Sequence, residues 1–347
     1  MAYSSIVKPE DYFNTVLYTG NGSTQSITGV GFQPDWVWIK GRSVAAGSNL
    51  SDSVRGVNKQ LQTASTAAEE TLTTCVTAFD SDGFSLGSNG NVNTNSGTFV
   101  AWNWLAGGSA SSNSNGSITS SVSANTTAGF SIVSYTGTGS VATVGHGLGV
   151  APKFIIVKTR SLSGEAWPVD SRAASGILYL NETGAKGSYG DSSPFPSTAP
   201  TSTVFSIGTP NNTNGSGATY IAYCFAEVKG YSKIGSYTGN GNADGTFVYT
   251  GFKPAWVMVR ETSNVNSWRI LDNKRDTFNV MTQSLYANLN NAEGSSGHNT
   301  DFISNGFKIR DSDTSMNRSS GSFIFMAFAE NPFVANDSGT AVPVVAR

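Results

Sequence analysis

Three short segments of the chain are apolar at every position, and they lie far apart in the sequence. They are residues 36–39 (Trp-Val-Trp-Ile), 154–157 (Phe-Ile-Ile-Val) and 256–259 (Trp-Val-Met-Val). A β-strand with one face in solvent alternates apolar and polar residues, whereas a strand covered on both faces is apolar throughout. The pattern therefore predicts three central strands, each buried between two layers of structure.

The sequence around these strands also recurs. Each strand follows a proline, and Pro34, Pro152 and Pro254 are separated by 118 (152 minus 34) and 102 (254 minus 152) residues. A Tyr-Thr-Gly segment precedes each proline, and a Phe-x-Leu/Ile segment and an aromatic closing strand follow each central strand. These markers lie at residues 18–22, 135–139 and 237–241; at 84–86, 205–207 and 307–309; and at 98–104, 219–225 and 322–328. Three markers in one order predict three diverged copies of a single module.

Each copy is about 100 residues long, the usual size of a small β-sandwich domain. Asp82-Gly83 and Asn305-Gly306 each precede a marker strand, and both dipeptides favour the tight turns of β-hairpins. We therefore expect an all-β fold made of three tandem repeats of a β-sandwich or jelly-roll-like module.

The repeat divides the chain into six segments. Residues 108–128 are rich in Gly, Ser and Asn, which is typical of a flexible linker. Only residues 227–236 join the second and third copies, so these two are expected to keep a fixed relative orientation. The predicted segments are an N-terminal arm (1–14), module 1 (15–107), the Gly/Ser/Asn linker (108–128), module 2 (129–230), module 3 (231–333) and a C-terminal tail (334–347).

Composition narrows the classes of function. Charged residues make up only 13% of the chain and the net charge is −2, so the basic face that phosphate neutralisation needs is not expected. No segment approaches the ~20 apolar residues of a membrane helix, and the first residues do not resemble a signal peptide. We expect synthesis in the cytoplasm, no nucleic-acid partner and no membrane insertion. The two cysteines, Cys75 and Cys224, are interpreted as reduced residues that pack in the interior.

The sequence offers no pattern that predicts catalysis. His146 and His298 lie in Gly-rich segments without a counterpart in the other modules, and we interpret both as loop residues. A nucleophile elbow and clustered Cys/His ligands do not occur, and residues 79–83 are interpreted as a hairpin turn rather than a calcium loop. The sequence therefore predicts no catalytic, cofactor-binding or metal-binding residue and no cofactor. A pair of loop carboxylates for glycan cleavage stays open as an alternative.

An acidic residue followed closely by a basic residue recurs once per module. This could bind a charged ligand, but its recurrence favours a structural ion pair at a strand end. The pairs are Asp52 with Arg55, Asp170 with Arg172, and Asp272 with Arg275.

The tryptophans provide the candidate ligand-binding residues. Most of them fall on module strands, where packing in a core is the expected role. Trp167 and Trp268 instead lie near loops, just before the acidic positions. An aromatic face supplies apolar area at low entropic cost, so these two residues are predicted to stack on sugar rings.

Five segments carry a resemblance to a known family. They are residues 51–56 (Ser-Asp-Ser-Val-Arg-Gly), 79–87 (Phe-Asp-Ser-Asp-Gly-Phe-Ser-Leu-Gly), 98–108, 220–227 and 326–333. Together they resemble a family of uncharacterised virion proteins that is common in tailed bacteriophages of aquatic bacteria, including cyanophages. The resemblance extends from about residue 12 to residue 333. Members are usually described as tail, fibre or structural proteins, and the family provides no catalytic residues to transfer.

The resemblance implies a virion component, which the residue patterns fit. We expect a non-enzymatic tail fibre or tail-associated adhesin whose loops bind a glycan or protein of the host surface. A capsid decoration or head-fibre protein that stabilises the shell is the alternative. The expected partners are other virion proteins of the tail or capsid and further copies of this chain, in a homotrimer. The expected location is the virion, after synthesis in the host cytoplasm.

Overall fold

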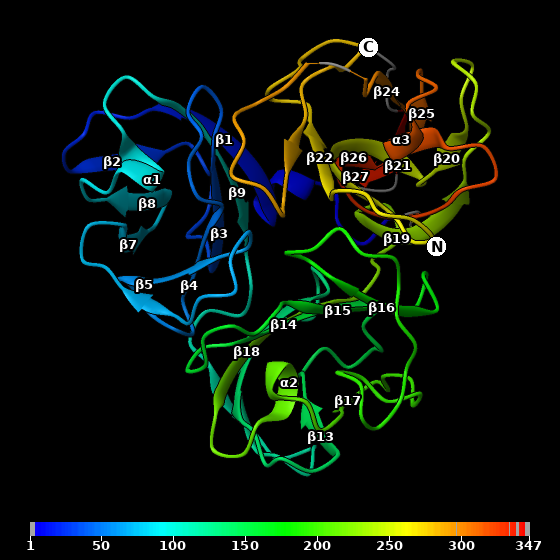
Figure 1. Ribbon diagram of the computed structural model, residues 1–347. Helices are drawn as coiled ribbons and strands as arrows, with labels where there is room; N and C mark the ends of the chain where they lie inside the picture. Colours follow the sequence, from blue (N-terminus) through cyan, green and yellow to red (C-terminus); the bar gives the residue numbers. More distant parts are fainter. Residues whose placement is uncertain (1–3, 296, 333, 338–339, 344–347) are drawn as a thin grey trace.

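A computed structural model describes residues 4–295, 297–332, 334–337 and 340–343 of the chain. Within these residues the chain folds almost wholly into antiparallel β-sheets, and the helices are single turns. The all-β class predicted from the sequence is confirmed. Three lobes, coloured blue to cyan, green, and yellow to red, surround a common centre (Figure 1).

Each lobe contains a large inner sheet and a small outer sheet. In module 1 the inner order is β1 (Phe13–Thr19), β9 (Thr98–Trp104), β3 (Trp36–Gly41), β4 (Asn49–Asp52), β5 (Lys59–Gln62) and β6 (Glu70–Thr71). Its outer sheet has the order β2 (Gln25–Thr28), β8 (Gly83–Leu86) and β7 (Val76–Asp80). The 3-10 turn η1 (Pro9–Asp11) precedes β1, and the one-turn helix α1 (Gly90–Asn93) precedes the closing strand β9.

Module 2 repeats this plan with two additional strands. Its inner order is β10 (Ser111–Asn113), β11 (Ser120–Asn125), β12 (Phe130–Thr136), β18 (Thr219–Phe225), β14 (Phe154–Thr159), β15 (Pro168–Ser171) and β16 (Gly176–Tyr179). The outer pair is β13 (Ala142–Gly145) with β17 (Val204–Ile207), and α2 (Asn211–Asn214) precedes the closing strand.

Module 3 has the inner order β19 (Ser232–Thr238), β26 (Ser322–Pro332), β21 (Phe252–Glu261), β22 (Arg269–Asp272) and β23 (Leu285–Tyr286). Its outer order is β20 (Phe247–Tyr249), β25 (Gly306–Ile309) and β24 (Thr300–Ile303), and α3 (Thr314–Asn317) precedes the closing strand. In all three modules the closing strand therefore lies between the first strand and the central strand. Both predicted hairpin turns are confirmed, because Asp80 pairs with Gly83 and Ile303 with Gly306.

The inner sheets are buried on both faces, as the apolar central strands predict. One face packs against the outer sheet of the same module in a separate small core. The other faces of all three sheets meet in one shared core, which contains Trp36 and Trp104 of module 1, Tyr223 of module 2, and Trp256 of module 3. The modules therefore pack together as one body and are not independent domains joined by linkers.

The Tyr-Thr-Gly segments have a local structural role. In each module the tyrosine hydroxyl donates to a backbone carbonyl of the one-turn helix, that of the residue just before an asparagine. In module 1, Tyr18 donates to Val92 O at 2.6 Å. That asparagine, Asn93 in module 1, accepts from the N–H of Asn21 at 2.8 Å and donates to Gly87 O at 2.8 Å. A Cβ at Gly20 would lie 2.3 Å from a backbone oxygen of the same turn, which explains the glycine. The equivalent asparagines of modules 2 and 3 are Asn214 and Asn317, with the same contacts.

Two predicted segment assignments need correction. Residues 108–128 are not a linker, because they contain β10 and β11, which extend the inner sheet of module 2. Their inward residues, such as Val122, pack in the core of that module, and this burial orders an otherwise Ser- and Asn-rich segment. The predicted arm (1–14) ends two residues late, since β1 begins at Phe13.

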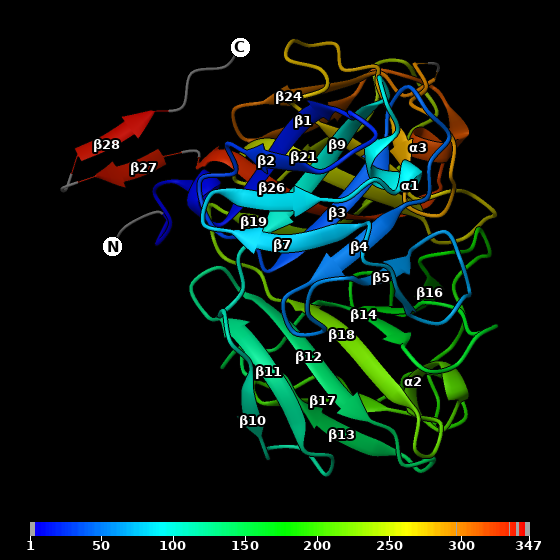
Figure 2. The same cartoon turned by 90° about the vertical axis from the view of Figure 1, so that its left-hand side faces the viewer.

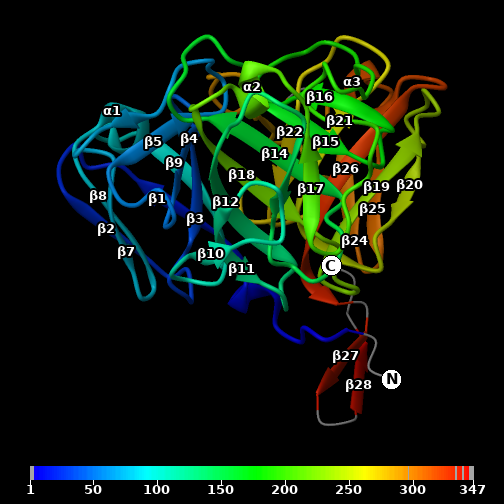
Figure 3. The same ribbon diagram turned by 90° about the horizontal axis from the view of Figure 1, so that it is seen from below.

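The C-terminal segment includes the hairpin of β27 (Val334–Asp337) and β28 (Thr340–Pro343). This hairpin pairs only with itself and extends away from the three modules (Figures 2 and 3). Residues 1–3 of the predicted arm, and residues 338–339 and 344–347 of the predicted tail, lie outside the described residues.

Candidate functional site

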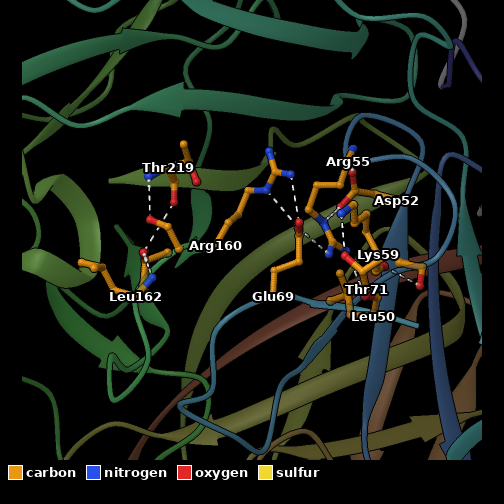
Figure 4. Close-up of polar contacts among 12 residues, drawn as sticks. Leu50, Asp52, Arg55, Lys59, Glu69, Thr71, Arg160, Leu162 and Thr219 are labelled. Atoms are coloured by element: carbon orange, nitrogen blue, oxygen red, sulfur yellow. Dashed lines mark hydrogen bonds and ion pairs between the residues drawn. The ribbon is translucent and has the colours of Figure 1, made fainter. Parts of the chain in front are cut away.

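A group of buried charges lies where module 1 meets module 2 (Figure 4). Asp52 ends β4, and the chain turns so that the guanidinium of Arg55 returns to that carboxylate. The Arg55 Nη1 also contacts Glu69 at 3.2 Å. Glu69 in turn binds Arg160 of module 2 through two hydrogen bonds of 2.9 and 3.0 Å. The hydroxyl of Tyr223, also from module 2, donates to Asp52 Oδ2 at 2.7 Å.

The surroundings of Arg55 and Glu69 keep both side chains charged. Burial alone would lower the pKa of Arg55, but Asp52, Tyr223 and Glu69 together raise it, so the guanidinium stays charged. Burial would raise the pKa of Glu69, but hydrogen bonds from Arg160 and the charge of Arg55 hold it below its usual value. Burial raises the pKa of Tyr223 well above 10, so its hydroxyl remains a donor. Both carboxylates accept from several donors, Asp52 from Arg55 and Tyr223, and Glu69 from Arg55 and Arg160.

The same group recurs where module 3 meets module 1. Asp272 accepts from Arg275 at 2.5 Å, and Trp102 of module 1 donates its Nε1–H to Asp272 Oδ2 at 3.0 Å. Glu293 joins Arg275 at 2.8 Å to Arg42 of module 1 at 2.9 Å. Trp102 and Tyr223 occupy the same position of their closing strands. Tyr18 pairs with Phe99 and Tyr135 pairs with Tyr220, and Trp102 and Tyr223 each lie three residues after that partner. The predicted Asp–Arg ion pairs of modules 1 and 3 are therefore present, and each belongs to a joint between modules.

The joint between modules 2 and 3 lacks these charges. Trp36 pairs with Asp52 and Trp256 with Asp272, whereas Phe154 pairs with Ser171. The other members of the group are also replaced. Ala174 stands at the position of Arg55, three residues after Ser171, and Met326 stands at the position of Tyr223 on the closing strand. Lys186 and Thr262 stand at the positions of Glu69 and Arg160. The backbone contact is retained, because Lys186 N donates to Thr262 O at 2.9 Å as Glu69 N donates to Arg160 O at 2.8 Å.

The predicted equivalence of Asp170 with Asp52 and Asp272 is wrong by one position. Asp170 pairs with Ile155, so it lies on the opposite face of the sheet, toward the small core of module 2. The predicted ion pair with Arg172 is present, at 2.9 Å, and Asp170 also accepts from the hydroxyl of Tyr189 at 2.7 Å. Burial raises the pKa of this carboxyl.

A second set of buried cations crosses all three joints. Lys40, Lys158 and Arg260 are the next-to-last residues of the three central strands. Each donates to a backbone carbonyl of the neighbouring module. The acceptors are Leu289 at 2.5 Å, Thr66 at 3.1 Å and Gly184 at 2.5 Å. Burial lowers the pKa of Lys40 to about 7 and that of Lys158 to about 8. These residues tie the modules into a closed ring.

Trp167 and Trp268, the predicted sugar-stacking residues, belong to the same joints. Both are buried in the shared core. Trp167 Nε1 donates to Ser65 O of module 1 at 2.9 Å, and Trp268 Nε1 donates to Tyr179 O of module 2 at 2.9 Å. Neither ring has a face open to a ligand, because each loop folds over the neighbouring module. The sequence places these residues beside loops but does not reveal which surface covers them.

The histidines and cysteines are placed in the interior. His146 accepts from Leu148 N at 3.2 Å, and burial lowers its pKa. His298 lies beside Arg269, and burial together with that charge lowers its pKa to about 4. Cys75 and Cys224 are free and buried, as predicted, and burial raises the pKa of both thiols.

Two surface hollows lie at the ends of the joints. One of about 470 Å³ lies between modules 3 and 1, and its lining includes Asn14 and Asn273. The other, of about 570 Å³, lies between modules 1 and 2 and includes Asp35. Asp35 is saturated there, since it accepts from Ser53 Oγ at 2.7 Å and from the N–H groups of Ala106 at 2.8 Å and Gly108 at 3.2 Å.

The described part of the chain carries neither a candidate metal site nor a candidate membrane-spanning helix. No three or more His, Cys, Asp or Glu side chains gather in a way that could hold a metal ion. No described helix has the length and apolar character needed to cross a membrane.

Residues 8–332 match a family described as a domain of unknown function, DUF7483. Because the match covers most of the chain, the chain belongs to this family. Comparison with curated proteins found no match.

Proposed function

We propose that the chain is a structural protein of a bacteriophage virion that works without catalysis, as a tail fibre or tail-associated adhesin that contacts the host surface. The resemblance of residues 51–56, 79–87 and 98–108 to phage virion proteins supports the virion assignment. The observation that carries the non-enzymatic part is the use of the buried ionisable groups. Asp52, Arg55, Glu69 and their counterparts in module 3 join modules to one another.

The shape of the body also supports a binding role. Three inner sheets share one core, and the outer sheets lie on the side of each module away from it. Such a body presents its outer sheets and loops in a fixed arrangement. A preorganised surface loses little conformational freedom on binding, which favours affinity.

The shared core limits how the protein would attach to the virion. Because the three modules pack as one unit, a single module would not serve as a mount from which the other two extend. The hairpin β27–β28 lies outside that unit, and we propose it as the attachment element (Figure 2). A homotrimer remains the proposed assembly.

Immunogold labelling of intact virions, with antibody raised against the whole folded chain, tests the proposal. Gold at the tail tip or on fibres is the expected result, and purified protein should then compete with virions for adsorption to host cells. Gold spread over the head would contradict the adhesin role and favour the alternative of a capsid decoration protein. Virions without label would remove the virion assignment itself.

A further inference from the structure

The outer sheet of module 3 carries two exposed aromatic residues. Phe247 and Tyr249 lie on its edge strand β20 and are 43% and 55% exposed, while Val248 between them is buried. Alternate residues of a strand point to the same face, about 7 Å apart. The two rings therefore project together from the surface of the module.

The other modules do not carry aromatic residues at these positions. Val248 pairs with Phe307, and its counterpart Ile27 pairs with Phe84 in module 1. The positions of Phe247 and Tyr249 are therefore those of Ser26 and Thr28, both exposed. In module 2, where Val144 pairs with Phe205, they are Thr143 and Gly145. Because the module folds with small residues there, the aromatic pair of module 3 is not required by the fold.

Charged side chains surround this aromatic pair. Lys308 pairs directly with Phe247 on the neighbouring strand, and Asp301 pairs with Lys308 on the next strand. Lys308 Nζ contacts Asp244 at 2.6 Å, and Arg310 Nε contacts Asp301 at 3.4 Å. The outer sheet of module 3 thus combines the flat apolar surface of two aromatic rings with hydrogen-bond donors and acceptors whose charges cancel.

A neighbouring hollow extends the surface. Tyr249 lines a cavity of about 550 Å³ together with Glu227, Lys229 and Lys233. Glu227 is joined to Lys233 at 3.1 Å and to Lys153, so both signs of charge are present there too. The aromatic pair therefore continues into a depression that carries both signs of charge, with two lysines and one carboxylate in its lining.

We propose that this surface of module 3 is a glycan-binding site. A sugar ring has an apolar face of C–H groups, which packs on an aromatic ring, and a rim of hydroxyls, which needs both donors and acceptors. A stable protein partner would cover about 800 Å² on each side, far more than two rings provide. An anionic ligand would select an excess of Lys and Arg around the rings, but on the sheet two cations face two carboxylates. Lysines exceed carboxylates only in the neighbouring hollow.

The inference rests on the proposed adhesin function and assigns its binding residues. They differ from Trp167 and Trp268, whose rings are buried. Phe247 and Tyr249 would supply the stacking surface, and Lys308, Asp301, Arg310 and Asp244 would contact the hydroxyls.

The test compares the full chain with the double variant Phe247→Ser/Tyr249→Thr, which copies the residues of module 1. The probe is an array of bacterial capsular and O-antigen glycans, followed by calorimetric titration with the glycan that binds best. We expect the double variant to lose at least 10-fold in affinity and Lys308→Ala to lose several-fold. Phe278→Ser, which changes an aromatic residue that is 76% exposed elsewhere in module 3, should bind as the wild type does.

Other outcomes would overturn the assignment, and host-cell binding distinguishes them from failure of the function. If the wild type binds cells or glycans and the double variant binds equally well, the chain is an adhesin with a different site. If the wild type binds host cells but no glycan, the receptor is not a sugar and the site assignment fails. If the wild type binds neither, the adhesin function fails as well. Urea unfolding of each variant checks that the fold is retained.

Discussion

The hydroxyl of Tyr223 donates a hydrogen bond to the carboxylate of Asp52 at 2.7 Å, across the joint between modules 2 and 1. Trp102 makes the equivalent bond to Asp272 across the joint between modules 1 and 3. At the third joint the two positions are Met326 and Ser171, which do not form such a bond. The third joint therefore has neither the donor, which is Tyr223 or Trp102 at the other joints, nor the buried carboxylate that accepts from it. This is expected, because a buried carboxylate without a hydrogen-bond partner is destabilising.

Replacing Tyr223 by Phe should destabilise the protein by about 1–3 kcal/mol, because a buried bond to a charged acceptor is lost while Asp52 stays buried. Urea unfolding followed by tryptophan fluorescence measures the change. Met326→Leu, at the same position of module 3, removes no polar contact and should cost less than about 1.5 kcal/mol. Equal stability of Tyr223→Phe and the wild type would show that the bond does not hold the joint.

Glu69→Gln should reduce the sensitivity of stability to acid. The pKa of Glu69 is lower in the folded chain than its usual 4.5, so the stabilisation is present above that value and is lost as the pH falls through the folded pKa. We expect the difference in unfolding free energy between wild type and Glu69→Gln to be about 1–3 kcal/mol near pH 6 and to shrink toward pH 3. The exposed residue Glu10 offers a matched control, since Glu10→Gln should change the unfolding free energy by less than about 0.5 kcal/mol.

Lys40→Met should change the response of stability to alkali. Burial and the charge of Arg275 lower the pKa of Lys40 from 10.5 to about 7 in the folded chain. Between these values the unfolded chain binds more protons than the folded chain, so stability rises with pH. From pH 7 to pH 9 the wild type should gain up to about 2–3 kcal/mol relative to Lys40→Met.

The comparison uses urea titrations of both proteins at each pH. Lys8 is exposed, and as a control Lys8→Met should change the unfolding free energy by less than about 0.5 kcal/mol. A constant difference between wild type and Lys40→Met would mean that Lys40 keeps its proton in the folded chain up to pH 9.

The sequence reveals the repeat and the buried central strands because both depend on local patterns. It does not reveal which residues form the joints, since that depends on surfaces brought together by the shared core. Asp170 shows the limit clearly, because a one-residue difference in register moves it to the opposite face of its sheet. Its spacing from Arg172 is two residues (172 minus 170), whereas the other two pairs are three apart (55 minus 52 and 275 minus 272). Asn93, Asn214 and Asn317 were detectable, because their steps of 121 (214 minus 93) and 103 (317 minus 214) resemble those of the other markers.

Asn93→Ala should be among the more damaging single changes in module 1. The side chain satisfies Asn21 N and Gly87 O, each at 2.8 Å, and its loss leaves these backbone groups without that partner. We expect a cost of about 2–4 kcal/mol in the urea unfolding free energy. Asn95 lies two residues later and is exposed, so Asn95→Ala should change stability by less than about 0.5 kcal/mol. Similar effects of the two variants would contradict a structural role for the repeated asparagine.

The shared core predicts that the three modules unfold together. Phe13 and Trp104 of module 1 contact Phe328 and Trp256 of module 3, with ring centroids 5.2 and 5.6 Å apart. A module that unfolded alone would expose these faces on its neighbours, so partly unfolded states are unfavourable. Scanning calorimetry should show one transition whose calorimetric and van 't Hoff enthalpies agree.

Trp104→Ala tests the same coupling through a single side chain. Removing this ring should cost about 3–5 kcal/mol and lower the melting temperature of the whole transition without splitting it. Phe278→Ser, on the surface of module 3, should leave the melting temperature nearly unchanged. Two or three separate transitions in the wild type, or a change confined to one of them in Trp104→Ala, would show that the modules are thermodynamically independent despite their contacts.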